Sequence, residues 1–321
     1  MRTLNMKTVL FTALVCALFA TACQKEQSAN LINQTPQTDI KGAVFADAAA
    51  LRKVPVVMVS NTATNGRKNK NTTTTISSPL PPTDTTTTTT TVPTDSVILV
   101  PAPSTSIPSS YSLVMPPIGY QGSEGSCVSW AVAYGARSCK QYYATNAFSY
   151  SYSSNIFSPE YVFNQTKADN NCGSSSMLSA MNLLVNQGVC TWQSMPYSYL
   201  NGCSQMPTSA QTAEAANYKI PAYARVLPSD QTTIKTMIAA KKTVPFTFNT
   251  DYTFDHATTG TIWTTYSGFT GAHAMVLCGY DDSKHAYRAM NCWGTSWGDA
   301  GYIWIDYDLL PVISFEAYIM N

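Results

Sequence analysis

The sequence predicts an α+β domain over residues 108–321, in which a helical half and a β half face each other across a cleft. Three observations support this prediction. Helix start and stop signals cluster between residues 127 and 188, whereas β-branched and aromatic runs separated by Gly, Asp and Ser fill residues 244–306. All six tryptophans lie beyond residue 107, so this region can bury a core of its own. Helices followed by strands are typical of the α+β class.

Each element has its own signal within this domain. The first helix is expected over about 127–142. The second begins at Ser158-Pro159-Glu160, where Ser158 is suited to the N-cap and Pro159 to the first turn, and the third covers 174–187 and ends at Gly188. A further helix is expected near 230–240. Strands are predicted at 244–249, 260–265, 273–280, 286–291 and 301–306.

The first 22 residues have the pattern of an export signal. Arg2 and Lys7 precede an apolar run over 9–20, which is shorter than the roughly 20 residues that a membrane-spanning helix needs. The following Ala20-Thr21-Ala22-Cys23 resembles the lipobox of bacterial lipoproteins, although ordinary cleavage after Ala22 is an alternative. The resemblance implies a protein exported to the bacterial cell envelope and held at the membrane through a lipid on Cys23, with residues 24–26 resembling a signal for the outer surface.

Residues 23–107 are predicted to be a largely disordered tether. This stretch is rich in Thr, Ser, Asn and Pro, and its threonine runs cannot form a periodic apolar face. The strand-like run 54–59 and the basic cluster 67–70 are interpreted as local features of a solvated tether. An inhibitory propeptide is the alternative, but the long amphipathic helices expected of one are missing.

Composition excludes several functions. Only 12% of the residues are charged and the formal net charge is +1, so we expect no nucleic-acid partner. No C-x-x-C pair occurs in the sequence, and we expect no metal and no cofactor.

Cys127 is a candidate nucleophile because it follows a glycine-containing loop at the start of a predicted helix. The partial positive charge of a helix N-terminus favours the thiolate and lowers the pKa of a thiol. A base is also needed, and His273 at the start of a predicted strand is better placed than His256 or His285, which both lie in turns. Asn291 ends the next strand of the same hairpin, so the two side chains can meet.

Three blocks, 121–130, 273–280 and 291–302, resemble the signature blocks of the papain-like cysteine peptidases in order and spacing. The resemblance implies a helical half whose central helix carries the nucleophile, a β-barrel-like half and a cleft between them. It further implies roles for individual residues. These are Cys127 as nucleophile, His273 as general acid and base, Asn291 as the group that orients the imidazole, Gln121 as an oxyanion-hole donor, Trp293 as a shield over the active site, and Ser174 and Ser175 as the edge that pairs with the substrate backbone.

Two residues beside Cys127 depart from the family pattern. Glu124 stands where many members have a disulfide cysteine, and Val128 replaces a tryptophan. Glu124 is expected to face outward, with electrostatic opposition to the thiolate as the alternative. Cys172 therefore lacks its usual partner and is expected to be free or paired elsewhere, with Cys139 as a candidate. The spacing of Cys190 and Cys203 suggests a disulfide between them.

We therefore expect a monomeric cysteine-type endopeptidase that hydrolyses peptide or protein substrates through a Cys127–His273 pair and a thioester. A catalytically silent binding head of the same fold, carried on a surface lipoprotein, is the alternative. A smaller cell-wall peptidase of the Cys–His type fits the second half of the domain poorly.

Overall fold

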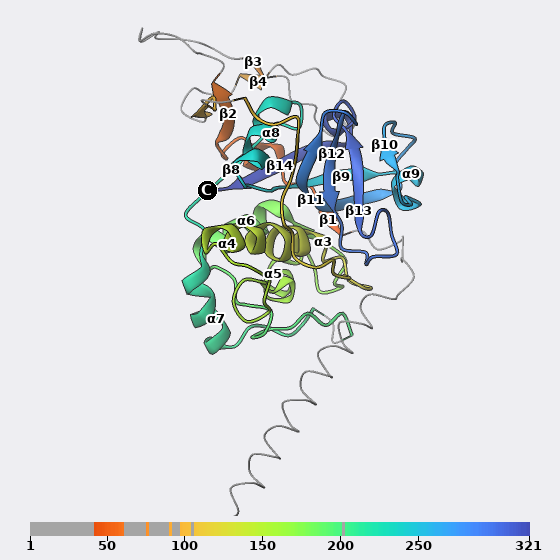
Figure 1. Ribbon diagram of the computed structural model, residues 1–321. Coiled ribbons are helices and arrows are strands. Elements are labelled where there is room, and N and C mark those ends of the chain that lie inside the picture. Colours follow the sequence, from red (N-terminus) through yellow and green to blue (C-terminus); the bar gives the residue numbers. More distant parts are fainter. Residues whose placement is uncertain (1–41, 61–74, 77–89, 92–96, 104–105, 201–202) are drawn as a thin grey trace, which may run out of the picture.

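The computed structural model describes residues 42–60, 75–76, 90–91, 97–103, 106–200 and 203–321. Helices α3 to α7, within residues 127–215, gather on one side of the molecule, and a twisted sheet lies on the other, with α8 (Gln231–Ala239) and α9 (Tyr252–Asp255) beside its strands (Figure 1). The predicted signal peptide, Cys23 and the basic cluster 67–70 lie outside the described residues. No helix among the described residues is both long enough and apolar enough to cross a membrane.

The predicted first helix is a continuous helical run over residues 127–144. It consists of α3 (Cys127–Ser129), a π-helix (Trp130–Arg137) and α4 (Ser138–Ala144). Gly135 faces the sheet, where an added Cβ would lie 2.8 Å from Val276 Cγ2. The absence of a side chain therefore lets this helical run lie close against the strand that carries His273.

The other helices follow the predicted signals closely. Ser158 caps α5 (Pro159–Thr166) by accepting a hydrogen bond from the Tyr161 N–H, and Asp230 caps α8 (Gln231–Ala239) in the same way. Gly188 has a φ of +88° just after the third predicted helix, as expected of a helix end. The remaining helices are α2 (Ala48–Leu51), α6 (Met177–Asn186), α7 (Ser209–Ala215), a 3-10 turn (Ala216–Tyr218), α9 (Tyr252–Asp255) and α10 (Leu310–Ile313).

The sheet is open, and the predicted β-barrel-like half is wrong in this respect. Its strands follow the order β10-β13-β12-β11-β9-β14-β8-β2-β5, with β6 paired to β11. The two ends of this order, β10 and β5, are not joined, so no barrel closes among the described strands. The strands are β2 (Val56–Ser60), β5 (Val97–Pro101), β6 (Ser110–Ser112), β8 (Tyr223–Arg225), β9 (Val244–Thr250), β10 (Ile262–Trp263), β11 (Gly271–Asp281), β12 (Ala286–Met290), β13 (Tyr302–Asp306) and β14 (Ser314–Met320). Two short pairs lie outside this sheet, β1 (Ala43–Val44) with β7 (Ser175–Ser176) and β3 (Thr75–Ile76) with β4 (Thr90–Thr91).

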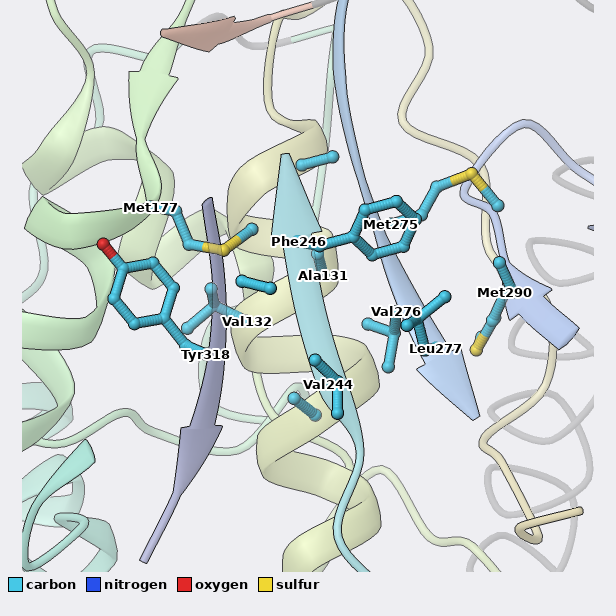
Figure 2. Close-up of a cluster of buried hydrophobic side chains, with 14 of the residues drawn as sticks. Ala131, Val132, Met177, Val244, Phe246, Met275, Val276, Leu277, Met290 and Tyr318 are labelled. Atoms are coloured by element: carbon cyan, nitrogen blue, oxygen red, sulfur yellow. The ribbon is translucent and has the colours of Figure 1, made fainter. Parts of the chain in front are cut away.

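The core lies between the helical run and the sheet. Val132 of the helix and Phe246 of β9 are fully buried, as are Val276 of β11 and Tyr318 of β14. Figure 2 shows these side chains on both sides of β9, with the helix behind the strand. Burial of this apolar surface stabilises the contact between the two halves, at about 25 cal/mol per Å² removed from water.

Part of the predicted tether is folded, so the expectation of a largely disordered 23–107 fails for its described segments. β2 pairs in parallel with β8 and β5, and Val56, Val57 and Val59 are buried. The Arg225 N–H donates to the Pro55 carbonyl at 2.8 Å. A short apolar run that would be too weak to form structure alone is stabilised here by an existing sheet edge.

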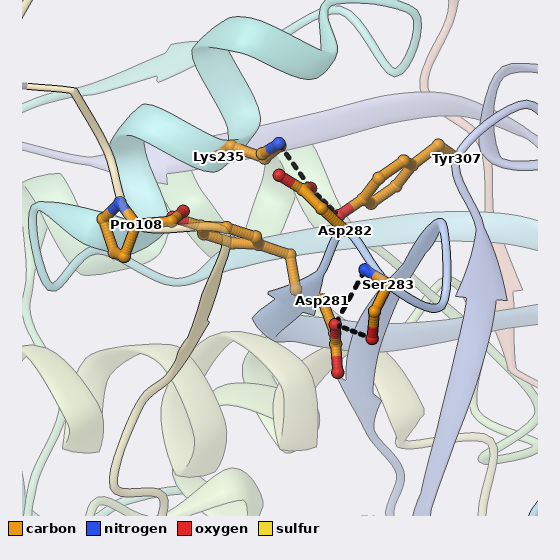
Figure 3. Close-up of polar contacts among 7 residues, drawn as sticks. Pro108, Lys235, Asp281, Asp282, Ser283 and Tyr307 are labelled. Carbon is orange, nitrogen blue, oxygen red and sulfur yellow. Dashed lines mark hydrogen bonds and ion pairs between the residues drawn. The ribbon is translucent and has the colours of Figure 1, made fainter.

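The first residues of the predicted domain, 108 and 109, are hydrogen-bonded to the β half. Tyr280 Oη donates to the Pro108 carbonyl at 2.9 Å, and the Asp282 N–H donates to the Ser109 carbonyl at 2.8 Å. The Asp282 carboxylate also accepts hydrogen bonds from Lys235 Nζ at 2.5 Å and Tyr307 Oη at 2.8 Å (Figure 3). These contacts tie the start of the domain and α8 to the turn after β11.

Among the cysteines that the structure describes, one disulfide joins Cys172 to Cys203, with a Cα–Cα distance of 5.6 Å. The predicted Cys190–Cys203 bridge is wrong, and so is the suggested pairing of Cys172 with Cys139. Cys190 and Cys139 are buried free thiols in the core, as are Cys278 and Cys292. The spacing of Cys190 and Cys203 gives only the length of the loop that a bridge would close. In the folded chain Cys203 pairs with Cys172, and Cys190 is buried elsewhere in the core.

Candidate active site

A tight loop holds Cys127 at the start of the helical run. The Gly125 N–H donates to the Cys172 carbonyl at 2.7 Å, and an added Cβ on Gly125 would lie 1.8 Å from the Gly173 carbonyl oxygen. Glycine is therefore required where the two backbones meet. The disulfide of Cys172 thus anchors the segment against which the loop before Cys127 is packed.

Cys127 is completely buried. Burial raises the pKa of its thiol to about 11, although the backbone N–H groups of Gly42, Ala274, Val128 and Cys127 itself act in the opposite direction. The expected lowering of this pKa by the helix N-terminus is therefore outweighed in this structure. Since Ala274 follows His273 directly, its contact with the sulfur brings the two predicted catalytic elements together.

His273 and Asn291 meet as predicted. β11 and β12 are antiparallel neighbours with Val276 opposite Met290, and His273 Nε2 donates to Asn291 Oδ1 at 2.8 Å. Both side chains are buried. Because Nε2 carries the proton of this hydrogen bond, the neutral ring has its lone pair on Nδ1.

Aromatic rings enclose the imidazole. The Trp293 ring lies 4.6 Å from the His273 ring, and the rings of Phe248 and Phe254 each lie 5.8 Å from it. Trp293 is 1% exposed. Trp293 therefore lies where a shield for the His273–Asn291 hydrogen bond is needed.

The Gln121 side chain is held from two sides. Its Oε1 accepts hydrogen bonds from Cys292 Sγ at 3.0 Å and Trp293 Nε1 at 3.1 Å, and its Nε2 donates to the Glu124 carbonyl at 2.7 Å. These contacts fix which end of the amide is the donor. The contribution of Cys292 was not predicted, because a cysteine next to Asn291 gives no signal of a partner 171 residues away.

The predicted substrate edge is paired with a segment of the chain itself. The Ser175 N–H donates to the Gly42 carbonyl at 2.8 Å, and β1 pairs in parallel with β7, Ala43 opposite Ser175. Ser174 is half-buried beside this pair. Figure 1 shows β1 near α3 and the sheet. Residues 42–46, here called the covering segment, therefore occupy the edge at which a peptide is expected to add.

Several contacts hold the covering segment in place. The Ala46 N–H donates to Glu316 Oε2 at 3.2 Å, and the Phe45 ring packs against the Phe315 ring at 5.8 Å. Gly42 lies so close to the nucleophile loop that an added Cβ would be 1.9 Å from the Gly125 carbonyl oxygen. The sequence signal for this contact is weak, because a glycine followed by a short apolar run occurs in many kinds of local structure.

Glu124 does not face outward, so that expectation is wrong. Its side chain is 3% exposed and lies among the groups that support the loop before Cys127. Burial, together with the nearby charge of Glu160, raises the pKa of the Glu124 carboxyl to about 7.

The other histidines lie outside this site. His256 is exposed and its ring stacks on Tyr252 at 3.9 Å. His285 is exposed at the opposite end of β11 from His273. Among the described residues, His285, Asp306 and Asp308 place ligand atoms within 4.8 Å of one another, far from Cys127 along the strand.

Comparison with known proteins identifies the family. A model described as papain family cysteine protease matches residues 107–312. The chain belongs to the papain family of cysteine proteases. The predicted resemblance is thereby confirmed for the family, and the matched region begins next to the predicted domain boundary at residue 108.

Two curated proteins illustrate the similarity. Gamete and mating-type specific protein A of Dictyostelium discoideum is 30% identical over 210 residues, which is 63% of this chain and 43% of that protein. Peptidase 1 of Psoroptes ovis is 28% identical over 158 residues, which is 46% of this chain and 47% of that protein. The chain spans less than half the length of these relatives.

Solved structures confirm the papain-like fold. Xylellain, a cysteine protease from Xylella fastidiosa, matches with a TM-score of 0.58 at 21% identity, over 67% of this chain and 87% of that chain. Procathepsin L2 from the Tenebrio molitor larval midgut matches with a TM-score of 0.55 at 20% identity, over 68% of this chain and 69% of that chain. At these identities the similarity concerns the fold alone.

Proposed function

We propose that this chain is a cysteine endopeptidase in which Cys127 is the nucleophile, His273 the general acid and base, and Asn291 the residue that orients the imidazole. The observation that carries the proposal is the 2.8 Å hydrogen bond from His273 Nε2 to Asn291 Oδ1, beside a cysteine at the start of a helix. A ring fixed through Nε2 can accept the thiol proton at Nδ1.

The reaction would proceed through a thioester. The Cys127 thiolate attacks the peptide carbonyl carbon while His273 holds the thiol proton, and the tetrahedral oxyanion is stabilised by the Cys127 N–H and the Gln121 side-chain amide. His273 then gives its proton to the leaving amine. Water, deprotonated by His273, attacks the thioester and releases the carboxylic acid product and the thiol.

The covering segment would have to leave before a peptide could bind. Ser175 already donates its N–H to Gly42, and Cys127 is completely buried. A peptide that adds to the same edge needs only main-chain hydrogen bonds, so it would compete with residues 42–44. The fully buried thiol also favours the second candidate, a silent binding head.

Export and lipid anchoring belong to the same proposal. Cys23 would carry the lipid and hold the domain at the bacterial cell envelope, with the domain acting as a monomer on peptide or protein substrates. The Cys172–Cys203 disulfide supports an oxidising compartment. Replacement of Cys23 by Ser should move the protein from the membrane fraction to the soluble fraction, and an unchanged membrane fraction would rule out Cys23 as the anchor.

Labelling with an epoxysuccinyl inhibitor followed by peptide mapping tests the enzymatic role. We expect the label on Cys127, loss of peptide hydrolysis in Cys127→Ala and near-normal hydrolysis in His256→Ala, which serves as the control. A folded wild-type protein that neither takes up the label nor hydrolyses a peptide library would instead be a binding head. Loss of activity in His256→Ala would mean that the base is misassigned.

A further inference from the structure

We propose that Glu124 is a positioning residue whose protonation state controls the loop over residues 121–127 through the hydroxyl group of Tyr197. Glu124 acts on the reaction only through this loop, which carries Gln121 and ends at Cys127. The inference rests on the proposed function, because it concerns the rate of that reaction.

Tyr197 Oη is the centre of a buried network. It donates to the Gln121 carbonyl at 2.6 Å, lies 2.6 Å from Ser126 Oγ and lies 3.2 Å from Glu124 Oε2. The Gln121 side chain closes the loop by donating from Nε2 to the Glu124 carbonyl at 2.7 Å. One hydroxyl group therefore connects the first, fourth and sixth residues of the segment that leads to the nucleophile.

The number of protons in this network decides which contacts can form. Tyr197 Oη has a single hydrogen, whereas the Gln121 carbonyl and an ionised Glu124 carboxylate can both only accept. When Glu124 is protonated, its O–H donates to Tyr197 Oη, and Tyr197 donates to Gln121. When Glu124 loses that proton to solvent, its carboxylate competes with the Gln121 carbonyl for the Tyr197 hydrogen.

The surroundings keep this proton on Glu124. Glu160 on α5 is also buried, but its two carboxylate oxygens accept from Asn164 Nδ2 at 2.9 Å and the Ser198 N–H at 3.2 Å. Glu124 Oε1, in contrast, is buried with no hydrogen-bond partner among the described residues. The loss of solvent on burial and, second to it, the charge of Glu160 disfavour the Glu124 carboxylate, whereas the hydrogen bond from Tyr197 favours it. The remaining titratable group on the loop is Cys127 itself.

The loop transmits the change to the reacting atoms. Gln121 is the proposed oxyanion donor, and the Gly125 N–H is bound to the Cys172 carbonyl two residues before the nucleophile. A weaker Tyr197–Gln121 contact loosens the end of the loop that holds the donor. The cost is a fraction of the roughly 10²- to 10³-fold loss caused by removing such a donor outright.

The ratio of kcat/KM between Glu124→Gln and the wild type, measured with a peptide substrate across pH 5–9, tests the inference. Glutamine is neutral at every pH and can donate from Nε2 to Tyr197. We expect the ratio to rise about three- to tenfold as the pH passes through the ionisation of Glu124, with the change in kcat rather than in KM. Glu160→Gln should move the same step to lower pH, because it removes the repelling charge.

Two controls separate this role from a general effect. Asp308→Asn, at an exposed carboxylate beside His285, should follow the wild type at every pH. Tyr197→Phe should lower kcat and abolish the step in the ratio. A Glu124→Gln profile parallel to the wild type would overturn the proposal.

An infrared measurement separates failure of this inference from failure of the proposed function. A folded wild-type protein that hydrolyses no peptide would contradict the function. The Tyr197 C–O stretch, assigned with Tyr197→Phe, should still shift at the pH where the protonated carboxyl band of Glu124 disappears. If the carboxyl band disappears without any shift of the tyrosine band, the two residues are not coupled and the inference is wrong.

Discussion

Glu124 and Glu160 place two acidic side chains inside the helical half, next to the loop that carries Cys127. The Glu160 carboxylate accepts hydrogen bonds from two donors. The Glu124 carboxyl group has one long hydrogen bond through Oε2, and its Oε1 has no hydrogen-bond partner among the described residues. Burial of a carboxylate without full compensation costs free energy. At neutral pH the folded protein is therefore less stable than it would be with an uncharged side chain of the same shape at position 124.

We predict that Glu124→Gln makes the free energy of unfolding less dependent on pH. The pKa of Glu124 is raised from 4.5 to about 7, so between these values the folded protein binds more protons at this site than the unfolded chain does. Stability contributed by Glu124 is therefore fully present below about pH 4.5 and falls as the pH rises to about 7.

Denaturant titrations at pH 4.5, 6 and 8 check this prediction. The stability of Glu124→Gln relative to the wild type should increase across this range, by at most about 3 kcal/mol. Asp308→Asn is again the matched control, because the Asp308 side chain is 90% exposed. A constant difference between Glu124→Gln and the wild type would mean that Glu124 ionises normally in the folded protein.

The residues whose chemistry is needed could be proposed from the sequence, but their supporting partners could not. His273 and Asn291 are brought together by a hairpin whose strands were predicted, and the structure joins them by a hydrogen bond. Cys292 and Tyr197 support Gln121 from positions 171 and 76 residues away. Contacts of this kind depend on packing between elements, which local sequence patterns do not encode. The roles of the site residues stay predictions.

The covering segment is the element on which access to Cys127 depends. It is short, and its β1 contributes only a two-residue strand to the pair with β7. Glu316 and Phe315 on β14 hold its far end. Elements with few hydrogen bonds open at low free-energy cost, so this segment should be among the first to separate from the domain.

We predict that Gly42→Val speeds alkylation of Cys127 by about tenfold. A Cβ on Gly42 would lie 1.9 Å from the Gly125 carbonyl oxygen, a backbone atom that cannot move aside easily. Overpacking of this kind costs about 1–3 kcal/mol, which shifts the segment towards the open state. The measurement is the rate of iodoacetamide labelling at Cys127, mapped by mass spectrometry.

Ala49→Val provides the control for this experiment, because Ala49 is an exposed residue of α2 in the same part of the chain. Its labelling rate should match that of the wild type. Equal rates in Gly42→Val and the wild type would mean that the thiol is reached without displacement of residues 42–46.

Elements with a local pattern could be predicted, and elements that depend on their neighbours could not. The five predicted strands of the second half are present as β9 to β13, some of them shorter or longer by a few residues. β14 was missed because six of its seven residues are buried, so polar and apolar residues do not alternate along it. β1 was not predicted, and the strand-like run 54–59, which contains most of β2, was interpreted as part of a solvated tether. β1 and β2 are strands only because β7 and β8 offer them free edges.

At the scale of the whole molecule, the disulfide joins two segments of the helical half. Cys172 lies just before β7, and its carbonyl accepts from the Gly125 N–H of the nucleophile loop. We predict that Cys203→Ser lowers the free energy of unfolding by about 2–4 kcal/mol, as expected for closure of a loop of this length. Thermal and denaturant unfolding of the variant measure this loss.

Dithiothreitol distinguishes loss of the bond from loss of the side chain. Reduction should destabilise the wild type by the same amount and leave Cys203→Ser unchanged. Cys190→Ala, at a buried free thiol, should remain as sensitive to the reductant as the wild type. If reduction leaves the wild type as stable as before, the bond does not contribute to the folded state.

The order of segments along the chain has a mechanical consequence. Counted from the N-terminal side, the two-residue β1 over the active site comes before the five-residue β2, which is paired on both sides in the sheet. A pulling force applied upstream of residue 42 would therefore load the β1–β7 hydrogen bonds first and peel the covering segment away one bond at a time. β2 would take up the load only afterwards. Tension on the N-terminal side could thus uncover Cys127 while the rest of the domain remains folded.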